Sequence, residues 1–201
     1  MARFLPVSLM ALCLLLGGCS PGGVSRIRAQ VRDWPGEAGQ VMILGGGGAA
    51  LTSSAIDKVG RFTLPLPGAA AMAPLLRPTL QPNLAAGCTD KVAVSDPAAQ
   101  FYLLPSISAS AAGTALTLVS QTRSNVPGGP LDQRVYIYAS TPARVQGDST
   151  CAVAASSTSY ALNLKAGWNY AVMRRPTPSS PARLESVGDD GFEGWEVAKG
   201  K

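Results

Sequence analysis

Histidine is absent from this sequence, and charged residues make up only 14% of it. Without histidine, no Ser-His-Asp or Cys-His catalytic arrangement can be assembled. The G-x-S-x-G motif of many serine hydrolases and the S-x-x-K motif of serine–lysine hydrolases are also missing from the chain. We therefore expect a protein that is not an enzyme and that needs no cofactor.

Long hydrophobic runs are missing from the sequence after residue 18. A membrane-spanning helix needs about 20 predominantly apolar residues, and no later segment approaches that length. Long amphipathic helical patterns are also absent, whereas 22 glycines and 16 prolines accompany many Ser, Thr and Val residues. This composition favours short strands joined by turns, and it predicts an all-β fold.

The N-terminal segment has the features of a signal peptide. Residues 1–3 form a short basic segment, and residues 4–16 form an apolar run too short to cross a bilayer as a permanent helix. The run ends in Leu16-Gly17-Gly18-Cys19, which resembles the lipobox of bacterial lipoproteins. The resemblance implies that residues 1–18 are removed and that Cys19 carries the lipid. The protein is then anchored on the extracytoplasmic side of the cell membrane or the outer membrane.

Two further cysteines remain in the mature chain. Cys13 lies inside the apolar run and should leave with the signal peptide. Cys88 and Cys151 are then the two thiols left for an oxidising compartment, which favours a disulfide between them. The alternative is a two-cysteine metal site, which is weakened by the absence of histidine and of a C-x-x-C motif.

Alternation with a period of two is the main structural signal along the chain. In the first strand expected, Ile27, Ala29 and Val31 alternate with polar and basic residues. Further strands are expected at 40–44, 49–56, 61–67, 91–94, 100–104, 114–122, 133–140, 149–154, 157–164, 168–174, 183–187 and 194–197, the last two of them at sheet edges.

The segment 57–67 carries a family resemblance. A turn ending in Gly60 leads into a strand on which Phe62, Leu64 and Leu66 face the same way. Together with the early strands, this D-x-x-G-x-F-x-L segment resembles the transthyretin-like or carboxypeptidase-regulatory-like β-sandwich. The resemblance covers about residues 24–67, and it implies a module that binds, spaces or stabilises rather than one that catalyses.

The expected architecture is an antiparallel β-sandwich of short strands, in one or two small units. A five-residue tether, 19–23, follows the signal peptide, and the first sandwich occupies 24–104. Residues 105–113 are small and polar, which predicts a linker to a second all-β unit at 114–201. The alternative is that the two units pack as one domain.

A closing hairpin is expected in the second unit, with its two strands on either side of Lys165-Ala166-Gly167. Tyr160, Leu162 and Leu164 should share its core face. The segment from Tyr160 to Asn169 resembles a hairpin of uncharacterised envelope lipoproteins, which implies a location and not an activity.

Two groups of side chains are candidates for ligand binding. Tyr136 and Tyr138 must share one strand face, and with Trp168 they could stack on sugar rings; the favoured interpretation is that they cover the core, as aromatic residues in strands usually do. The second group, Asp189, Asp190 and Glu193, has the oxygen ligands that calcium prefers. It fits no EF-hand spacing, and a solvated acidic turn is the favoured interpretation.

The formal net charge of +5 comes from basic residues spread along the chain. They are too dispersed in sequence for a nucleic-acid footprint, and they indicate solubility and attraction to anionic envelope surfaces. We expect a non-catalytic structural or protein-interaction role in the cell envelope. The expected partners are membrane lipid, through acylated Cys19, and an envelope protein; the alternative function is carbohydrate binding.

Overall fold

The computed structural model describes residues 23–80, 88–123, 129–151, 156–177, 179–188 and 194–198. Strands dominate these residues, which confirms the all-β prediction. The strands are β1 (Arg26–Arg32), β2 (Gly39–Leu44), β3 (Ala50–Ile56), β4 (Arg61–Pro65), β5 (Cys88–Val94), β6 (Phe101–Leu104), β7 (Ile107–Ala111), β8 (Thr114–Arg123), β9 (Leu131–Ala139), β10 (Ala143–Cys151), β11 (Ser156–Leu164), β12 (Gly167–Arg175), β13 (Ala182–Ser186) and β14 (Trp195–Val197). One short helix, α1 (Ala69–Met72), and two 3-10 turns, Gly46–Gly48 and Ala73–Leu75, complete the described elements. No helix in this part of the chain has the length and apolar character needed to cross a membrane.

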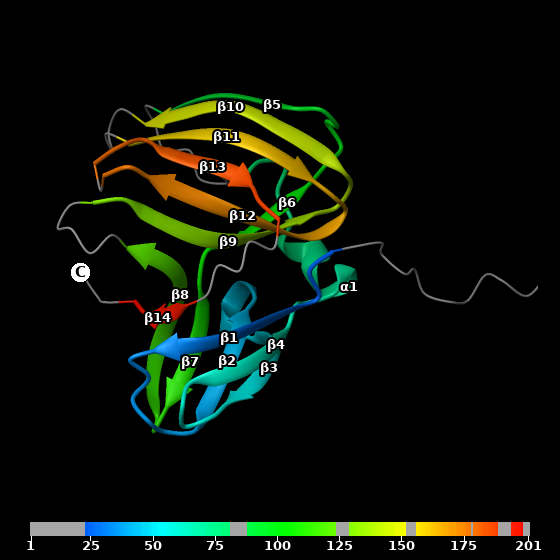
Figure 1. Cartoon of the computed structure of the whole chain (residues 1–201). Helices are drawn as coiled ribbons and strands as arrows, with labels where there is room; N and C mark the ends of the chain where they lie inside the picture. The colour runs from blue at the N-terminus through cyan, green and yellow to red at the C-terminus, as the bar shows by residue number, and fades with distance from the viewer. Residues whose placement is uncertain are drawn as a thin grey trace, which may run out of the picture.

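Seven strands close into a barrel, which forms the lower part of the molecule in Figure 1. Its order is β1-β4-β3-β2-β7-β8-β14, and the ring closes because β14 pairs with both β8 and β1. The two pairings of β14 meet at one residue: Trp195 is opposite Ser120 in the antiparallel pair with β8 and opposite Val31 in the parallel pair with β1. The expected sandwich is therefore replaced by a closed barrel, since a three-residue strand late in the chain joins the two free edges.

The remaining strands form a curved sheet above the barrel, in the order β9-β12-β13-β11-β10-β5 (Figure 1). Strand β9 connects the two parts along one edge. Its first residues pair with β8, from Ser120↔Arg134 to Arg123↔Leu131, and its last residues pair with β6, from Leu104↔Tyr136 to Phe101↔Ala139. The sheet of fourteen strands is thus continuous from the barrel to the outer strand β5.

Strand β9 is buried on both of its faces. Tyr136 and Tyr138 pack into the core shared with the barrel, whereas Val135 and Ile137 pack into the core under the curved sheet. The prediction that the two tyrosines share a face opposite Val135 and Ile137 is confirmed, because side chains alternate along a strand. The barrel core is formed chiefly by Ile27, Val31, Val41, Ile43, Ile56, Phe62, Leu64, Ile107 and Leu118, and the sheet core by Phe101, Val145, Tyr160, Leu162, Leu164 and Leu184.

The predicted division into two units does not match the strand pairing. Residues 105–113, expected to be a linker, contain β7, which lies between β2 and β8 in the barrel. Ile107, Ala109 and Ala111 are buried there, so small alternating residues mark a core strand and not a spacer. Strand β5, placed in the first unit by the sequence, pairs with β10 of the second and with no other described strand.

The predicted closing hairpin is wrong in its pairing, although its two strands exist. Strand β13 lies between β11 and β12, parallel to the first and antiparallel to the second. Ala182 and Leu184 of β13 are buried, so this short strand fills the interior of the sheet and is not the expected edge. The expected core face of β11 is confirmed, since Tyr160, Leu162 and Leu164 are all buried.

The turn between β3 and β4 matches its sequence signal. Asp57 Oδ1 accepts hydrogen bonds from the backbone N–H groups of Val59 (3.0 Å) and Arg61 (2.8 Å). Gly60 has a φ of +79°, and a Cβ there would crowd the Val31 carbonyl and the Trp34 side chain. This turn fixes the side chains of Lys58 and Arg61 next to the end of β1.

A candidate anion-binding groove

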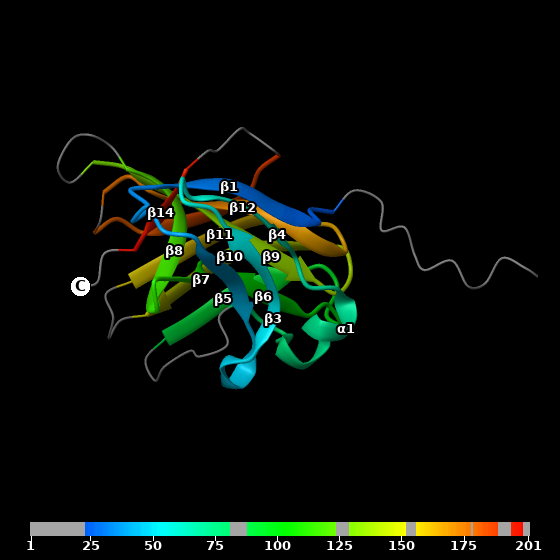
Figure 2. The same ribbon diagram turned by 90° about the horizontal axis from the view of Figure 1, so that it is seen from below.

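A groove with a volume of about 1750 Å³ lies between the barrel and the curved sheet. One wall is the outer side of β1 and β4, and the other is formed by β9, β12 and the residues that follow β13. Figure 1 shows β1 running beneath β12, and in the turned view of Figure 2 the two strands overlie each other. The backbone N–H of Val24 donates to the Trp168 carbonyl at 3.1 Å, which joins the walls at one end.

The lining of this groove is strongly cationic. It includes seven basic residues, Arg26, Arg28, Arg32, Lys58, Arg61, Arg134 and Lys165. Asp33 is the one acidic residue among the described residues that line it. The chain as a whole has 17 basic and 12 acidic residues, so the groove concentrates positive charge well beyond the average.

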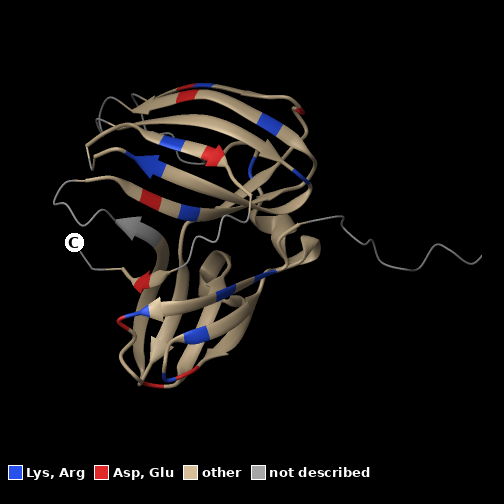
Figure 3. Ribbon diagram, in the orientation of Figure 1, with Lys and Arg blue, Asp and Glu red and all other residues tan. Residues whose placement is uncertain are grey.

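The barrel wall owes its charge to strand alternation. Ile27 and Val31 point into the barrel, so Arg26, Arg28 and Arg32 point outward from β1. On β4, Phe62 and Leu64 are buried and Arg61 is exposed, directly opposite Gln30 of β1. Figure 3 shows the basic positions of β1 and β4 on the front of the barrel, below the curved sheet.

The sheet wall contributes a buried cation. Arg134 of β9 is only 6% exposed, and its guanidinium carbon lies 4.6 Å from the centre of the Tyr170 ring. A guanidinium over an aromatic face is stabilised by the ring quadrupole. Arg134 and Tyr170 both line the groove, so its floor combines a fixed positive charge with a flat aromatic surface.

Ion pairs neutralise some basic residues outside the groove, whereas five of the basic groove residues have no such partner among the described residues. Arg174 contacts Asp132 at 2.9 Å and Glu185 at 2.6 Å, and Arg183 contacts Glu185 at 3.1 Å. Within the part of the chain that the structure describes, five groove residues form no ion pair: Arg26, Arg28, Lys58, Arg61 and Lys165. Their charge is available to a ligand.

The aromatic residues predicted to stack on sugars are part of the core. Tyr136, Tyr138 and Trp168 are 3%, 8% and 5% exposed. Trp168 packs edge-on against Tyr138, with ring centres 5.4 Å apart, and its Nε1–H donates to the Pro67 carbonyl at 2.8 Å. These rings cannot present their faces to a sugar, so the glycan-binding interpretation of these residues is corrected to a structural one.

Two of the sites predicted from the sequence fall outside the part of the chain that the structure describes. Cys19 and the acidic group Asp189, Asp190 and Glu193 lie outside the described residues. Among the residues described, no group of three or more His, Cys, Asp or Glu side chains is placed to hold a metal ion.

The Asp96 carboxyl and the Tyr102 phenol have shifted pKa values, and neither residue lines the groove. Hydrogen bonds from the Thr141 hydroxyl (2.8 Å) and the Ala98 N–H (2.9 Å) lower the pKa of the Asp96 carboxyl below its ordinary value. Burial raises the pKa of the Tyr102 phenol. Asp96 stabilises the turn before β6, and Tyr102 packs edge-on against Trp168; both have structural surroundings.

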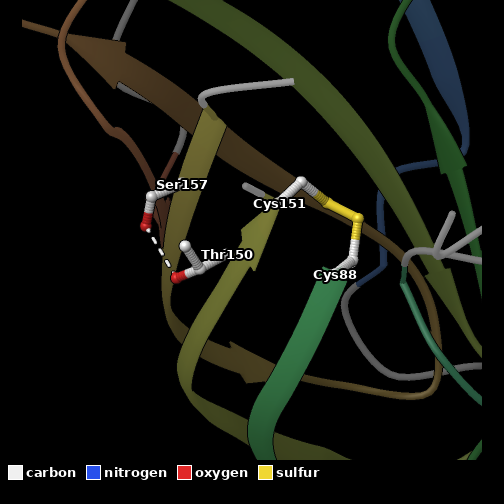
Figure 4. Close-up of a disulfide and its surroundings, with 4 residues drawn as sticks. All are labelled: Cys88, Thr150, Cys151 and Ser157. Carbon is white, nitrogen blue, oxygen red and sulfur yellow. Dashed lines mark hydrogen bonds between the residues drawn. A yellow bond between two sulfur atoms is a disulfide. The ribbon is translucent and has the colours of Figure 1, made fainter. Parts of the chain in front are cut away.

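Cys88 and Cys151 form a disulfide in the structure (Figure 4). They lie directly opposite each other at the first residue of β5 and the last residue of β10. Beside them, the Thr150 and Ser157 hydroxyls are 3.5 Å apart (Figure 4). The bond therefore fastens the outer strand of the curved sheet to its neighbour, and neither cysteine lines the groove.

Comparison of the chain with protein-family models, with curated proteins and with solved structures gave no match.

The groove is not predicted by the patterns in the sequence. The alternation of 26–32 indicated one basic strand face, but Arg61, Arg134 and Lys165 are isolated basic residues in three separate segments. Only the pairing of β1 with β4, and the position of β9 and β12 above them, bring these charges together. The basic residues that look dispersed along the chain are thus partly gathered in space.

Proposed function

We propose that this protein is a lipid-anchored, extracytoplasmic component of the bacterial cell envelope that binds an anionic partner, without catalysis, in the groove between barrel and sheet. The observation that carries this function is the groove lining, in which the described residues include seven basic residues and one acidic residue. Such a concentration of one sign of charge attracts and holds the opposite sign.

The proposed compartment is supported by two features. The Leu16-Gly17-Gly18-Cys19 motif resembles a lipobox, and a disulfide joins Cys88 to Cys151. Disulfides persist outside the reducing cytosol, which agrees with an extracytoplasmic protein. The transthyretin-like resemblance of residues 24–67 adds the expectation of a binding or spacing module.

A binding measurement on the groove tests this function directly. Binding of an acidic polypeptide, polyglutamate, should be measured by fluorescence anisotropy for the unchanged protein and for an Arg28→Glu, Arg61→Glu double variant. Both arginines are exposed and unpaired within the described chain, so the substitutions should preserve the fold. We expect the variant to lose at least about tenfold in affinity, because it reverses two charges of the groove.

A matched control is available on the curved sheet. Lys91 and Arg144 are exposed and lie outside the groove, on β5 and β10. The Lys91→Glu, Arg144→Glu variant has the same net charge as the groove variant and should bind polyglutamate almost as well as the unchanged protein. Equal losses in the two variants would show that net charge alone drives binding, and the proposed groove would be abandoned.

A further inference from the structure

The groove begins at the first residues that the structure describes. Gly23, Val24, Ser25 and Arg26 all line it, at the end where Val24 bonds to Trp168. Cys19, the expected lipid attachment site, precedes Gly23 by four residues. A chain spans at most about 3.6 Å per residue, so the lipid attachment lies within about 14 Å of this end of the groove.

The second end of the groove is also defined by backbone contacts. The N–H of Val31 donates to the Gly60 carbonyl at 2.9 Å, which places the turn carrying Lys58 beside the end of β1. Lys165 lies at the opposite end, in the turn just before β12. The two lysines therefore mark the ends of a cationic surface about as long as β1, roughly 20 Å.

We propose that the groove docks onto the phosphate headgroups of anionic lipids in the membrane that holds the anchor, so that β1 lies along the membrane surface. This inference rests on the proposed function and names its partner. The short tether holds the groove beside the bilayer, and its unpaired cations complement the lipid phosphates. Basic residues close to an anionic bilayer are attracted to it within a Debye length of about 8 Å at physiological salt.

The geometry favours lipid over an acidic protein partner for one reason. A partner from solution has no preferred side of the molecule, whereas the membrane is present at the tethered end from the moment of anchoring. Arg26 and Arg28 follow the tether directly, so the basic strand is the first part of the fold that the bilayer meets.

The test uses the mature lipidated protein in vesicles. Protein is inserted into vesicles of phosphatidylcholine alone or of phosphatidylcholine with phosphatidylglycerol, and exposed lysines are acetylated briefly with uncharged acetic anhydride. Mass spectrometry then gives the extent of labelling at Lys58, Lys165 and Lys91. All three are exposed, and Lys91 lies outside the groove, so it reports the general reactivity.

We expect labelling of Lys58 and Lys165 to fall about fivefold or more in the anionic vesicles, with Lys91 unchanged, because each basic residue interacts appreciably with an anionic surface. About 0.5 M salt should restore the labelling, since it shortens the Debye length to a few ångströms. The Arg28→Glu, Arg61→Glu variant should also restore it, and the Lys91→Glu, Arg144→Glu variant should keep Lys58 and Lys165 protected.

Several outcomes would overturn the inference. Protection of Lys165 alone would mean that the tether end is near the membrane but the groove does not lie on it. Equal labelling in the two kinds of vesicle, with polyglutamate still bound in the groove, would reject lipid as the partner and leave the proposed function standing. Equal labelling in the two kinds of vesicle together with no binding of polyglutamate in the groove would reject both proposals. An unlipidated mature N-terminus would reject the docking, because the docking depends on the lipid tether.

Discussion

The side chain of Ser186 substitutes for a strand residue beside Asn163. Its hydroxyl oxygen accepts a hydrogen bond from the Asn163 backbone N–H at 2.8 Å and its O–H donates to the Asn163 carbonyl at 3.2 Å. The hydroxyl thereby extends the parallel pairing of β11 with β13 beyond its last backbone pair, Ala161↔Glu185. This contact holds β13 in the place where the sequence predicts direct pairing between β11 and β12.

Substitutions at Leu162 and Asn163 should differ sharply in their effect on stability. Leu162 is buried in the sheet core, whereas the Asn163 side chain is exposed and the residue is held through its backbone. Leu162→Asp should lower the free energy of unfolding by several kcal/mol, and Asn163→Asp should change it by no more than about 0.5 kcal/mol. Thermal or denaturant unfolding of both variants compares them, and equally mild effects would contradict the described burial of β11.

Gly147 should not tolerate even a methyl group. Its φ is +125°, and a Cβ there would collide with the Lys91 carbonyl oxygen on the paired strand β5. We expect Gly147→Ala to destabilise the protein by roughly 2–4 kcal/mol, from backbone strain and displacement of β5. Gly68→Ala is the matched control, because Gly68 has a φ of −76° and open space around it; its effect should stay within about 0.5 kcal/mol.

Removal of the disulfide should weaken the curved sheet at its outer edge. The bond joins residues 63 apart in sequence. In the chain-entropy model, closing a loop of this size contributes about 4 kcal/mol, so the Cys88→Ser, Cys151→Ser variant should lose up to that amount. Urea unfolding measures the loss, and non-reducing peptide mapping should recover the two cysteines in one linked peptide pair. Two alkylatable thiols in the freshly purified mature protein would contradict the bond.

The Asp96 carboxyl should report its contact with Thr141. Because its pKa is lowered in the folded protein, the stabilisation it provides is present at pH values above the ordinary carboxyl pKa and is lost as the pH falls through the lower, folded value. Thr141→Val removes the first hydrogen bond and should raise the pKa of Asp96 toward its ordinary value, as followed by carboxyl NMR titration. Thr89→Val, at an exposed position of β5, should leave that titration unchanged.

The Cys19 thiol is the chemical requirement for the proposed lipid anchor. Cys19→Ala should yield a protein that is neither acylated nor cleaved at this position, since the thioether to lipid has no sulfur on which to form. Mass spectrometry of the mature N-terminus distinguishes the forms. An unmodified Cys19 in the unchanged protein, or a mature start elsewhere, would show that the lipobox resemblance is misleading.

Local patterns in the sequence predicted the strands well but not their neighbours. Alternation at 26–32 and at 157–164 gave the buried faces of β1 and β11, because the period of two depends only on adjacent residues. Strand β13 lies between β11 and β12, although these two strands are consecutive in the chain. No short sequence pattern predicts that a later strand will insert between them. The small and polar residues 105–113 predict a linker because Ser and Ala are common in linkers, whereas the barrel accepts small residues where β7 packs against β2 and β8.

The candidate groove was predictable only in part, for a similar reason. The basic face of β1 follows from the sequence alone, but its opposition to Arg134 and Lys165 is a consequence of tertiary packing. The aromatic residues illustrate the converse difficulty. Alternation correctly placed Tyr136 and Tyr138 on one face of β9, but it could not show that both faces of this strand are buried.

Ring closure by β14 has a consequence for biogenesis. In the export proposed for this protein, strand β1 would be among the first folded residues to emerge, but its edge is paired by Trp195–Val197, the last of the described strands in the chain. The barrel would therefore not complete itself during vectorial passage across the membrane, and its assembly would wait until β14 had been translocated. Pairing between such distant segments slows folding, so the chain would expose an open strand edge for longer than a protein built from local hairpins. During that interval a chaperone should be needed to prevent association through β1.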